Sequence, residues 1–168
     1  MPRSTRVTYA VFDIDGVLAD VRHRLHFIAT RPKNWRAFFE AATADPPLQV
    51  GIDRALAAVV AGLTIVYLTG RPENYRQATQ AWLDRFGLPP GALHMRGSND
   101  HRPARATKVA VLRELSKAGD IGEFVDDDPD VVAAVRAAEF PADHATWMVV
   151  TTDQQGELFA AQEIEGRS

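Results

Sequence analysis

Residues 9–25 read YAVFDIDGVLADVRHRL. An apolar run ends in two aspartates, Asp13 and Asp15, which are separated by one residue and followed by Gly16. In an extended chain, residues two apart point to the same side, so both carboxylates can face one crevice while Ile14 faces away. Two like charges at the end of a buried strand repel each other. The stretch therefore indicates a strand that leads into a functional site.

Short apolar runs and helical segments alternate along the chain. The runs are rich in β-branched and aromatic residues and nearly continuous, which is typical of strands buried on both faces. They span 7–12, 63–68, 122–125 and 146–150. Helical periodicity is found in 51–61, 73–86, 103–117 and 129–139. This alternation predicts an α/β fold with a central parallel sheet covered on both sides.

The segment 51–61 carries an apolar stripe that we expect to face the sheet. Its members are Ile52, Leu56, Val59 and Val60.

Residues 20–48 interrupt the alternation, and they predict one or two short helices inserted above the strand ends. The segment contains the aromatic residues Phe27, Trp35, Phe38 and Phe39. We expect these side chains to pack the insertion onto the core, and direct stacking on a substrate is the alternative.

Composition limits the possible classes of protein. A chain of 168 residues with 46% apolar and 24% charged residues predicts one domain over 1–168. A net charge of −3 does not indicate a polyanion-binding surface, and the absence of cysteine excludes disulfides and thiolate chemistry. No leader-like stretch and no run of 18 apolar residues occurs, so we expect a cytoplasmic protein with no membrane partner. The segment Ile164–Arg167 reads IEGR, which is either native or a protease-cleavage linker.

Polar residues follow the predicted strands where each one ends. They are Asp13 to Gly16, Thr69 to Arg71, and Asp126 to Asp128, with Lys108 near the start of a predicted helix. The carboxyl ends of parallel strands form the ligand crevice of such a sheet, so we expect these groups to meet there. Each motif alone is weak, since DDDP could be a helix N-cap and TGR a turn. Their common location favours a site.

The residue types predict a magnesium and phosphate site. Crowded carboxylates need a hard divalent cation, and Mg²⁺ accepts oxygen ligands, waters and substrate phosphates. Gly16 and Gly70 leave backbone amides open to an anion, and Thr69 offers a hydroxyl. Lys108 supplies a compact positive charge.

The motifs resemble those of the haloacid dehalogenase (HAD) superfamily of phosphohydrolases. VFDIDGVLAD is similar to its first motif, VYLTGR to the second and EFVDDDPDVV to the acidic fourth, while Lys108 matches the third. The resemblance implies a three-layer Rossmann-like fold with a small helical cap. It also implies Asp13 as nucleophile of an aspartyl-phosphate mechanism, Asp15 as general acid/base, and Thr69 and Lys108 as catalytic partners.

Further stretches resemble the 3′-phosphatase domain of phage-type polynucleotide kinase. They are NWRAFFEA with DPP, TGRPENYRQATQAWL, LHMRGSNDHRPARATKVAVL, and VDDDPDVVAAVRA with the later TWMVV. This resemblance implies Mg²⁺ held by Asp13, the Asp15 carbonyl and Asp127, and we also expect Asp126 to be a metal ligand. It implies substrate contacts from the glycines of the motifs and from arginines, namely Gly16, Gly70, Arg71, Arg76, Arg96 and Arg102.

The substrate is open at this stage. A nucleotide or the 3′-phosphate end of a nucleic acid is one hypothesis, and a small metabolite such as a nucleoside 5′-monophosphate is another. The sequence contains no G-x-x-x-x-G-K-[ST] loop of a kinase, and its negative charge does not favour binding to a nucleic-acid backbone. A non-catalytic protein that binds phosphate or a partner is the alternative from a different class. The oligomeric state is not predicted.

Overall fold

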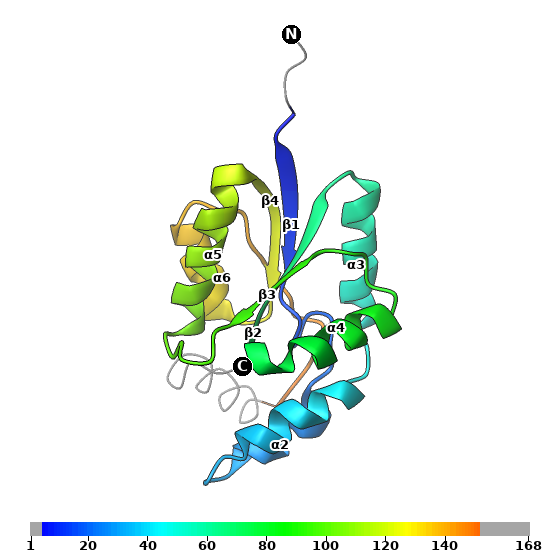
Figure 1. The fold of residues 1–168 in the computed structure, drawn as a ribbon, viewed down its shortest axis with the longest axis vertical. Helices are drawn as coiled ribbons and strands as arrows, with labels where there is room; N and C mark the ends of the chain where they lie inside the picture. Colours follow the sequence, from blue (N-terminus) through cyan, green and yellow to red (C-terminus); the bar gives the residue numbers. More distant parts are fainter. Residues whose placement is uncertain (1–4, 152–168) are drawn as a thin grey trace.

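Five parallel strands form one sheet in the computed structural model, which describes residues 5–151 (Figure 1). The strand order is β3–β2–β1–β4–β5, so β1 lies at the centre between β2 and β4. The strands are β1 (Val7–Phe12), β2 (Thr64–Pro72), β3 (Ala92–Arg96), β4 (Gly119–Asp126) and β5 (Asp143–His144). The chain builds β2 and β3 on one side of β1 and β4 and β5 on the other. The order therefore reverses between β1 and β4, which is where open α/β sheets bind their ligands.

Helices cover both faces of the sheet, as the alternating sequence pattern predicts. Figure 1 shows α5 and α6 on one side of β1 and α3 and α4 on the other. The helices are α3 (Gln49–Val60), α4 (Arg76–Arg85) after the short η3 (Glu73–Tyr75), α5 (Ala104–Ala118) and α6 (Pro129–Ala137). The longest of them, α5, has 15 residues, and no helix within residues 5–151 is long and apolar enough to span a bilayer.

The central strand β1 is buried on both faces, which explains its unbroken apolar sequence. Ala10 and Phe12 pack in the core under α3 and α4, whereas Val11 packs with Phe124 and Leu112 under α5 and α6. All five side chains are fully buried. Alternating residues of one strand thus serve two separate hydrophobic layers.

The apolar run 146–150 is not a strand, which corrects the sequence prediction. The fifth strand is the dipeptide 143–144, and beyond it the chain leaves the sheet. Trp147 donates from Nε1 to the carbonyl of Val17 at 2.8 Å, and Met148 packs into the core of the insertion. The apolar side chains are therefore buried against loops rather than against the sheet. At the opposite edge of the sheet, β3 was not predicted, because ALHMR is short and mixes apolar with polar residues.

The predicted stripe of α3 is also wrong in part. Ile52 is buried, but Leu56 and Val59 are more than 40% exposed and Val60 is 89% exposed. Small residues face inward instead, namely Gly51, Ala55 and Ala58. The helix lies so close to the loop after β1 that a Cβ on Gly51 would stand 1.9 Å from the carbonyl oxygen of Val17. Position 51 therefore has no room for a side chain.

Four short helices lie between β1 and α3, within the segment 20–48 that we call the insertion. They are η1 (Arg22–Arg24), α1 (His26–Ala29), α2 (Trp35–Glu40) and η2 (Ala41–Ala44). Figure 1 shows the insertion beyond the carboxyl end of β1. Phe38 and Phe39 are buried in its own small core, and Trp35 is only half-buried. Phe27 and Trp35 pack against the same core while partly exposed, so the packing expected for the insertion aromatics is complete for Phe38 and Phe39 and partial for the other two.

Candidate active site

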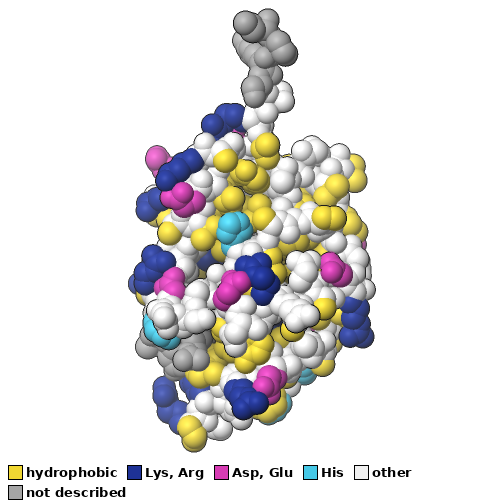
Figure 2. All heavy atoms as spheres, viewed as in Figure 1, with side chains coloured by type: hydrophobic (Ala, Val, Ile, Leu, Met, Phe, Trp, Pro, Cys, Tyr) yellow, Lys and Arg dark blue, Asp and Glu magenta, His cyan; other side chains and the backbone are white. Residues whose placement is uncertain are grey.

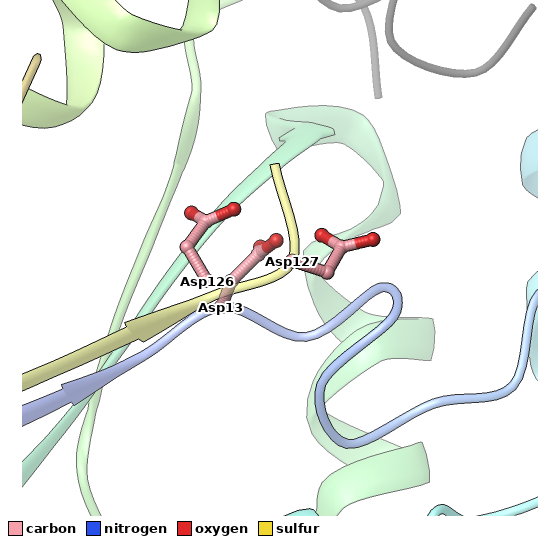
Figure 3. Close-up of side chains that lie close together, drawn as sticks. All are labelled: Asp13, Asp126 and Asp127. Carbon is pink, nitrogen blue, oxygen red and sulfur yellow. The ribbon is translucent and has the colours of Figure 1, made fainter. Parts of the chain in front are cut away.

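Three carboxylates meet where the strand order reverses. Asp13 follows β1, Asp126 ends β4 and Asp127 comes next in the chain. Figure 3 shows the three side chains projecting to the same side from the ends of the two neighbouring strands. One oxygen from each lies within 4.8 Å of the others, and all three residues are buried. Asp128, which follows Asp126 and Asp127 in the sequence, is the N-cap of α6. Its side chain accepts a hydrogen bond from the backbone N–H of Asp130 at 2.9 Å.

Lys108 of α5 brings the positive charge to this group. Its Nζ lies 2.7 Å from Oδ2 of Asp126 and 3.2 Å from Oδ1 of Asp13. The other oxygen of Asp126 accepts from the backbone N–H of Asp128 at 3.0 Å. Both oxygens of Asp126 are therefore engaged, and this residue fixes the position of the lysine.

One lysine does not balance three buried carboxylates. Burial and the charge of Asp126 raise the pKa of Asp13 to about 8, although Lys108 opposes the shift. Burial and the charge of Asp13 also raise the pKa of Asp127 well above its ordinary value. Burial would lower the pKa of Lys108, but Asp126 and Asp13 raise it further than burial lowers it. Full ionisation of the three carboxyls would leave the site with more negative than positive charge, and a bound cation would offset this excess.

Gly16 forms the wall of the site beside Asp127. Its φ is +78°, a conformation that glycine adopts without strain, and its N–H donates to the carbonyl of Ala19 at 2.9 Å. A Cβ at this position would stand 2.0 Å from Oδ2 of Asp127. Glycine is therefore required both by the turn and by the close approach of this carboxylate.

Asp15 lies in a different environment, a buried ion cluster made of Asp15, Arg24, Asp45 and Arg71. Arg71 donates to Oδ1 of Asp15 from Nε at 2.9 Å and from a terminal nitrogen at 2.5 Å, and Arg24 donates to the same oxygen at 3.0 Å. Both arginines also contact Asp45, Arg24 through two bonds of 2.8 Å and Arg71 through one of 3.0 Å. All four side chains are buried. Two guanidinium groups thus balance two carboxylates in the interior.

The ion cluster makes the two aspartates of the first motif chemically different. Burial alone would raise the pKa of Asp15, but the charges of Arg24 and Arg71 lower it to about 2. All three contacts from the arginines fall on Oδ1. Among the residues that the structure describes, none hydrogen-bonds to the buried Oδ2 of Asp15. One oxygen is thus held in place while the other has no hydrogen-bond partner among the described residues.

Arg24 and Asp45 are members of the site that were not predicted from the sequence. Arg24 lies in a basic stretch that is typical of a solvated surface. Asp45 precedes a Pro-Pro pair that is typical of a turn. The one usable signal was the position of Arg24 between Val21 and Leu25, two apolar residues that are buried with it. Arg24 reaches the cluster from the insertion, and its guanidinium carbon stands 4.3 Å from the ring centre of Phe38.

Thr69, Gly70 and Lys108 line a second feature, the apolar groove between β3 and α5. It has a volume of about 440 Å³, and its far end is lined by Val111, Leu115 and Ala118. Figure 2 shows hydrophobic side chains gathered between the α5 side and the α3 side of the molecule. Thr69 is buried, and its hydroxyl accepts from the N–H of Arg71 at 3.2 Å. The predicted phosphate-binding groups of β2 and α5 therefore share one wall of one cavity.

The remaining predicted arginines lie in different places. Arg96 is buried at the end of β3 and donates to the carbonyls of Asp100 and Arg102 at 3.2 and 2.8 Å. Arg102 is exposed, pairs with Asp100 at 2.8 Å and borders the apolar groove. Arg76 is exposed, pairs with Glu73 and donates to the carbonyl of Leu93 at 2.9 Å. The structure thus places Arg96 and Arg102 at the groove that Thr69 and Lys108 line, and it places Arg71 at Asp15. Arg76 lies at neither place.

The residues at the end of β1 and β4 fit a divalent cation. Among the described residues, none hydrogen-bonds to the buried Oδ1 of Asp127, and Asp13 lies in the same acidic group. Buried oxygen donors without a partner are the ligands that Mg²⁺ takes. Asp126 already uses both oxygens, so Asp13 and Asp127 are the side chains best placed to hold a metal ion.

Comparison with known proteins gives a consistent result. The family described as "Polynucleotide kinase PNKP phosphatase domain" matches residues 8–143. Among solved structures, a chain of a Pnkp1/Rnl/Hen1 complex is similar with a TM-score of 0.71 and 23% identity, over 86% of this chain and 46% of that one. A class C acid phosphatase from Bacillus anthracis with tungstate bound gives 0.61 and 19%, over 94% and 73%. A haloacid dehalogenase-like hydrolase from Streptococcus pneumoniae gives 0.61 and 13%, over 89% of each chain.

These structures share the fold of the chain, and their identities are too low to show more than the fold. The chain spans less than half the length of the Pnkp1-complex chains that it matches. No curated protein matches the sequence.

Proposed function

Because the chain belongs to the family of polynucleotide kinase phosphatase domains, within the HAD phosphatases, we propose that it is a Mg²⁺-dependent phosphomonoesterase working through an aspartyl-phosphate. The observation that supports this most directly is the contrast between the two aspartates of the first motif. Asp13 lies in the acidic group beside Lys108, whereas Asp15 is held by two arginines with one oxygen left open. A nucleophile and a proton-transfer group need different environments of this kind.

In the first step, a carboxylate oxygen of Asp13 attacks phosphorus in line with the leaving oxygen. The bond to the leaving oxygen breaks, and Asp15 delivers a proton to the departing alkoxide. The negative charge of a bound phosphate raises the pKa of Asp15 from its low resting value, which allows this carboxyl to carry the proton. Lys108, the hydroxyl of Thr69 and the amide of Gly70 stabilise the charge on the phosphoryl oxygens.

In the second step, Asp15 takes a proton from water while the water oxygen attacks the phosphorus of the aspartyl-phosphate. The bond between phosphorus and Asp13 breaks, and inorganic phosphate leaves. The arginines that lower the pKa of Asp15 favour its ionised form, which is the form that this base requires. Mg²⁺ held by Asp13, Asp127 and the Asp15 carbonyl would supply positive charge toward the phosphoryl oxygens when bound.

For the substrate, we propose a nucleotide or the 3′-phosphate end of a nucleic acid. The matched family and the RNA repair complex that contains a related fold support this choice. Within the same chemistry, a small metabolite such as a nucleoside 5′-monophosphate is the second candidate, and the net charge of −3 favours it. We propose one phosphatase domain with the insertion as a small cap. The cytoplasmic location stays a prediction, and the segment Ile164–Arg167 lies outside the described residues.

Hydrolysis of p-nitrophenyl phosphate with and without Mg²⁺ tests the activity. We expect turnover that requires the metal and that is abolished by Asp13→Asn. A wild-type protein that is inert with saturating substrate and Mg²⁺ would contradict the proposal. A panel of nucleoside 3′- and 5′-monophosphates and 3′-phosphorylated oligonucleotides then separates the two substrate classes.

A further inference from the structure

A second cavity opens between the insertion and the ends of β2 and β3, and we call it the aromatic cleft. It has a volume of about 480 Å³. Its lining includes Trp35 and Phe39 of α2, Tyr75 of η3 and Arg96 of β3, together with Arg36 and His101 at the rim. None of the catalytic carboxylates lines it. The proposed chemistry therefore leaves this cavity without a role.

The aromatic rings of the cleft are arranged in series. The ring centres of Trp35 and Phe39 lie 5.8 Å apart with an angle of 23° between planes, and those of Phe39 and Tyr75 lie 5.4 Å apart at 36°. Phe39 in the middle is buried, whereas Trp35 and Tyr75 on either side are half-buried. The buried ring thus supports two rings that can receive a flat ligand. A supported aromatic face is the feature that proteins use to stack unpaired nucleobases.

The charges around the cleft are modest. Arg36 pairs with Glu40 at 2.8 Å, and Lys33 lies over Trp35 with Nζ 5.8 Å from the ring centre. Figure 2 shows positive and negative side chains interspersed over the visible face rather than gathered in one basic patch. A long nucleic-acid backbone would find few phosphate contacts here. Stacking of one or two bases fits this surface better than tracking of a long strand.

Arg96 connects the cleft with the proposed phosphate site. It lines the aromatic cleft, and it also lines the apolar groove that Thr69 and Lys108 border. Pro72, which also lines the cleft, follows Arg71 of the buried ion cluster around Asp15. A ligand that places its phosphate beside Thr69 and Lys108 can thus extend past Arg96 toward Trp35 and Tyr75.

We propose that the aromatic cleft stacks the base of the nucleotide next to the phosphorylated one, so that the enzyme acts on a single-stranded end in preference to a mononucleotide. The inference rests on the proposed phosphatase function and adds a subsite to it. Trp35 and Tyr75 receive the base and Phe39 supports them. The apolar groove is the competing location for a base, because it borders the same phosphate-binding residues.

The test compares kcat/KM on p-nitrophenyl phosphate, thymidine 3′-monophosphate and a hexathymidylate with a 3′-phosphate. A stacked base is worth a factor of about 5 to 150 in affinity. We expect the wild-type enzyme to prefer the hexamer over the mononucleotide by about tenfold or more. Trp35→Ala removes most of this preference, and Trp35→Phe, which keeps an aromatic face, retains it. Tyr75→Ala provides a second variant if Trp35→Ala does not fold.

The matched control is Leu115→Ala in the apolar groove, which we expect to change the rates on all three substrates by one common factor. Equal kcat/KM for hexamer and mononucleotide would overturn the proposal, and so would a preference that survives in both Trp35→Ala and Tyr75→Ala. A preference lost in Leu115→Ala and kept in Trp35→Ala would assign the base to the groove instead. Equal rates of hydrolysis for a hexamer with a 5′-phosphate and for the 3′ form would overturn only the assignment of the substrate to 3′ ends.

A binding measurement separates this inference from the phosphatase proposal. Fluorescence anisotropy of a dye-labelled hexathymidylate with a 3′-hydroxyl requires no hydrolysis. We expect Trp35→Ala to raise the Kd of this oligonucleotide by about tenfold, even if no phosphomonoester is turned over. We also expect log Kd to change with log salt by a slope of about 0.7 to 1.4, which corresponds to one or two phosphates. An unchanged Kd in Trp35→Ala would contradict the aromatic cleft as a base-binding site.

Discussion

Asp45 and Arg24 form a buried bidentate ion pair. Nε and a terminal nitrogen of the arginine each lie 2.8 Å from a different oxygen of the carboxylate. Asp45 also receives a bond of 3.0 Å from Arg71. It does not contact Asp15, yet it holds both arginines that do. The position of the proposed proton-transfer group thus depends on a residue 30 positions away in the sequence.

Replacing Asp45 tests the role of this pair. In Asp45→Ala, two buried guanidinium groups share the single carboxylate of Asp15, and loss of one partner of a buried pair destabilises a fold by about 3–5 kcal/mol. We expect this loss in the free energy of unfolding measured with urea. The control is His23→Ala, since His23 Nε2 lies 2.7 Å from the same carboxylate but its side chain is 37% exposed. A loss of less than about 1 kcal/mol is expected there, and equal losses in the two variants would contradict the cluster's importance.

The second prediction concerns proton transfer by Asp15. p-Nitrophenolate leaves without a proton, whereas a sugar alkoxide needs one, so Asp15→Asn should slow nucleotide hydrolysis much more than formation of the aspartyl-phosphate from p-nitrophenyl phosphate. Attack by water still needs the missing base, so the phosphorylated enzyme accumulates. We expect a burst of nitrophenolate close to one equivalent per active site, followed by turnover reduced by about 10²–10⁴-fold. Rapid-mixing absorbance measurements check this, and a burst-free progress curve with the same loss on both substrates would contradict it.

The third prediction uses the glycine beside Asp127. Gly16→Ala introduces a Cβ 2.0 Å from Oδ2 of Asp127, so the carboxylate must move and Mg²⁺ affinity should fall by at least about tenfold. Gly62→Ala is a matched control, because its φ of +84° carries similar backbone strain while nothing lies within 4 Å of the added Cβ. Both variants should lose about 1 kcal/mol of stability from strain. Only Gly16→Ala should require more Mg²⁺ for half-maximal activity; a parallel change in Gly62→Ala would show that strain alone is responsible.

The fourth prediction follows from the acidic group. The pKa of Asp13 is about 8 in the metal-free fold and near 4 in the unfolded chain, so the folded state binds this proton more tightly. The corresponding stability is fully present below pH 4 and is lost as the pH rises toward 8. Without metal, Tm should therefore fall between pH 6 and pH 8. Mg²⁺ binds the ionised carboxylates, so the rise in Tm that it causes should be larger at pH 8 than at pH 6.

Thermal unfolding with EDTA and with excess Mg²⁺ at the two pH values measures these shifts. Asp127→Asn removes one buried charge, and we expect it to show a weaker dependence on pH and a smaller effect of Mg²⁺. An identical rise in Tm at pH 6 and pH 8 in the wild-type protein would contradict the prediction.

The parts of the fold predicted correctly from the sequence are those with a strong local pattern. The continuous apolar runs of β1, β2 and β4 and the periodicity around α4, α5 and α6 reflect burial against both faces of one sheet. The run 146–150 has the same local pattern, but its partners are the insertion and the loop after β1. Local sequence does not distinguish burial against a sheet from burial against loops.

The candidate site shows the same division. Asp13, Thr69, Lys108 and Asp127 could be placed together because each lies at or near the carboxyl end of a parallel strand, and parallel strands bring these ends to one edge. Arg24 and Asp45 lie in the insertion, where no comparable rule predicts which side chains meet. Their meeting depends on how the short helices pack, and charged side chains rarely signal burial in a sequence.

The buried ion cluster has a consequence for the catalytic cycle. Two of its members, Arg24 and Asp45, belong to the insertion. Of the other two, Asp15 lies in the loop after β1 and Arg71 lies in β2. If the insertion opened as a lid, the buried ion pairs between these residues would break. This loss of buried ion pairs would recur in every turnover. We therefore expect the insertion to stay in place while the substrate enters and leaves. For the proposed phosphatase, we expect chemistry or phosphate release to limit turnover, and not the hinge motions that govern many lidded enzymes.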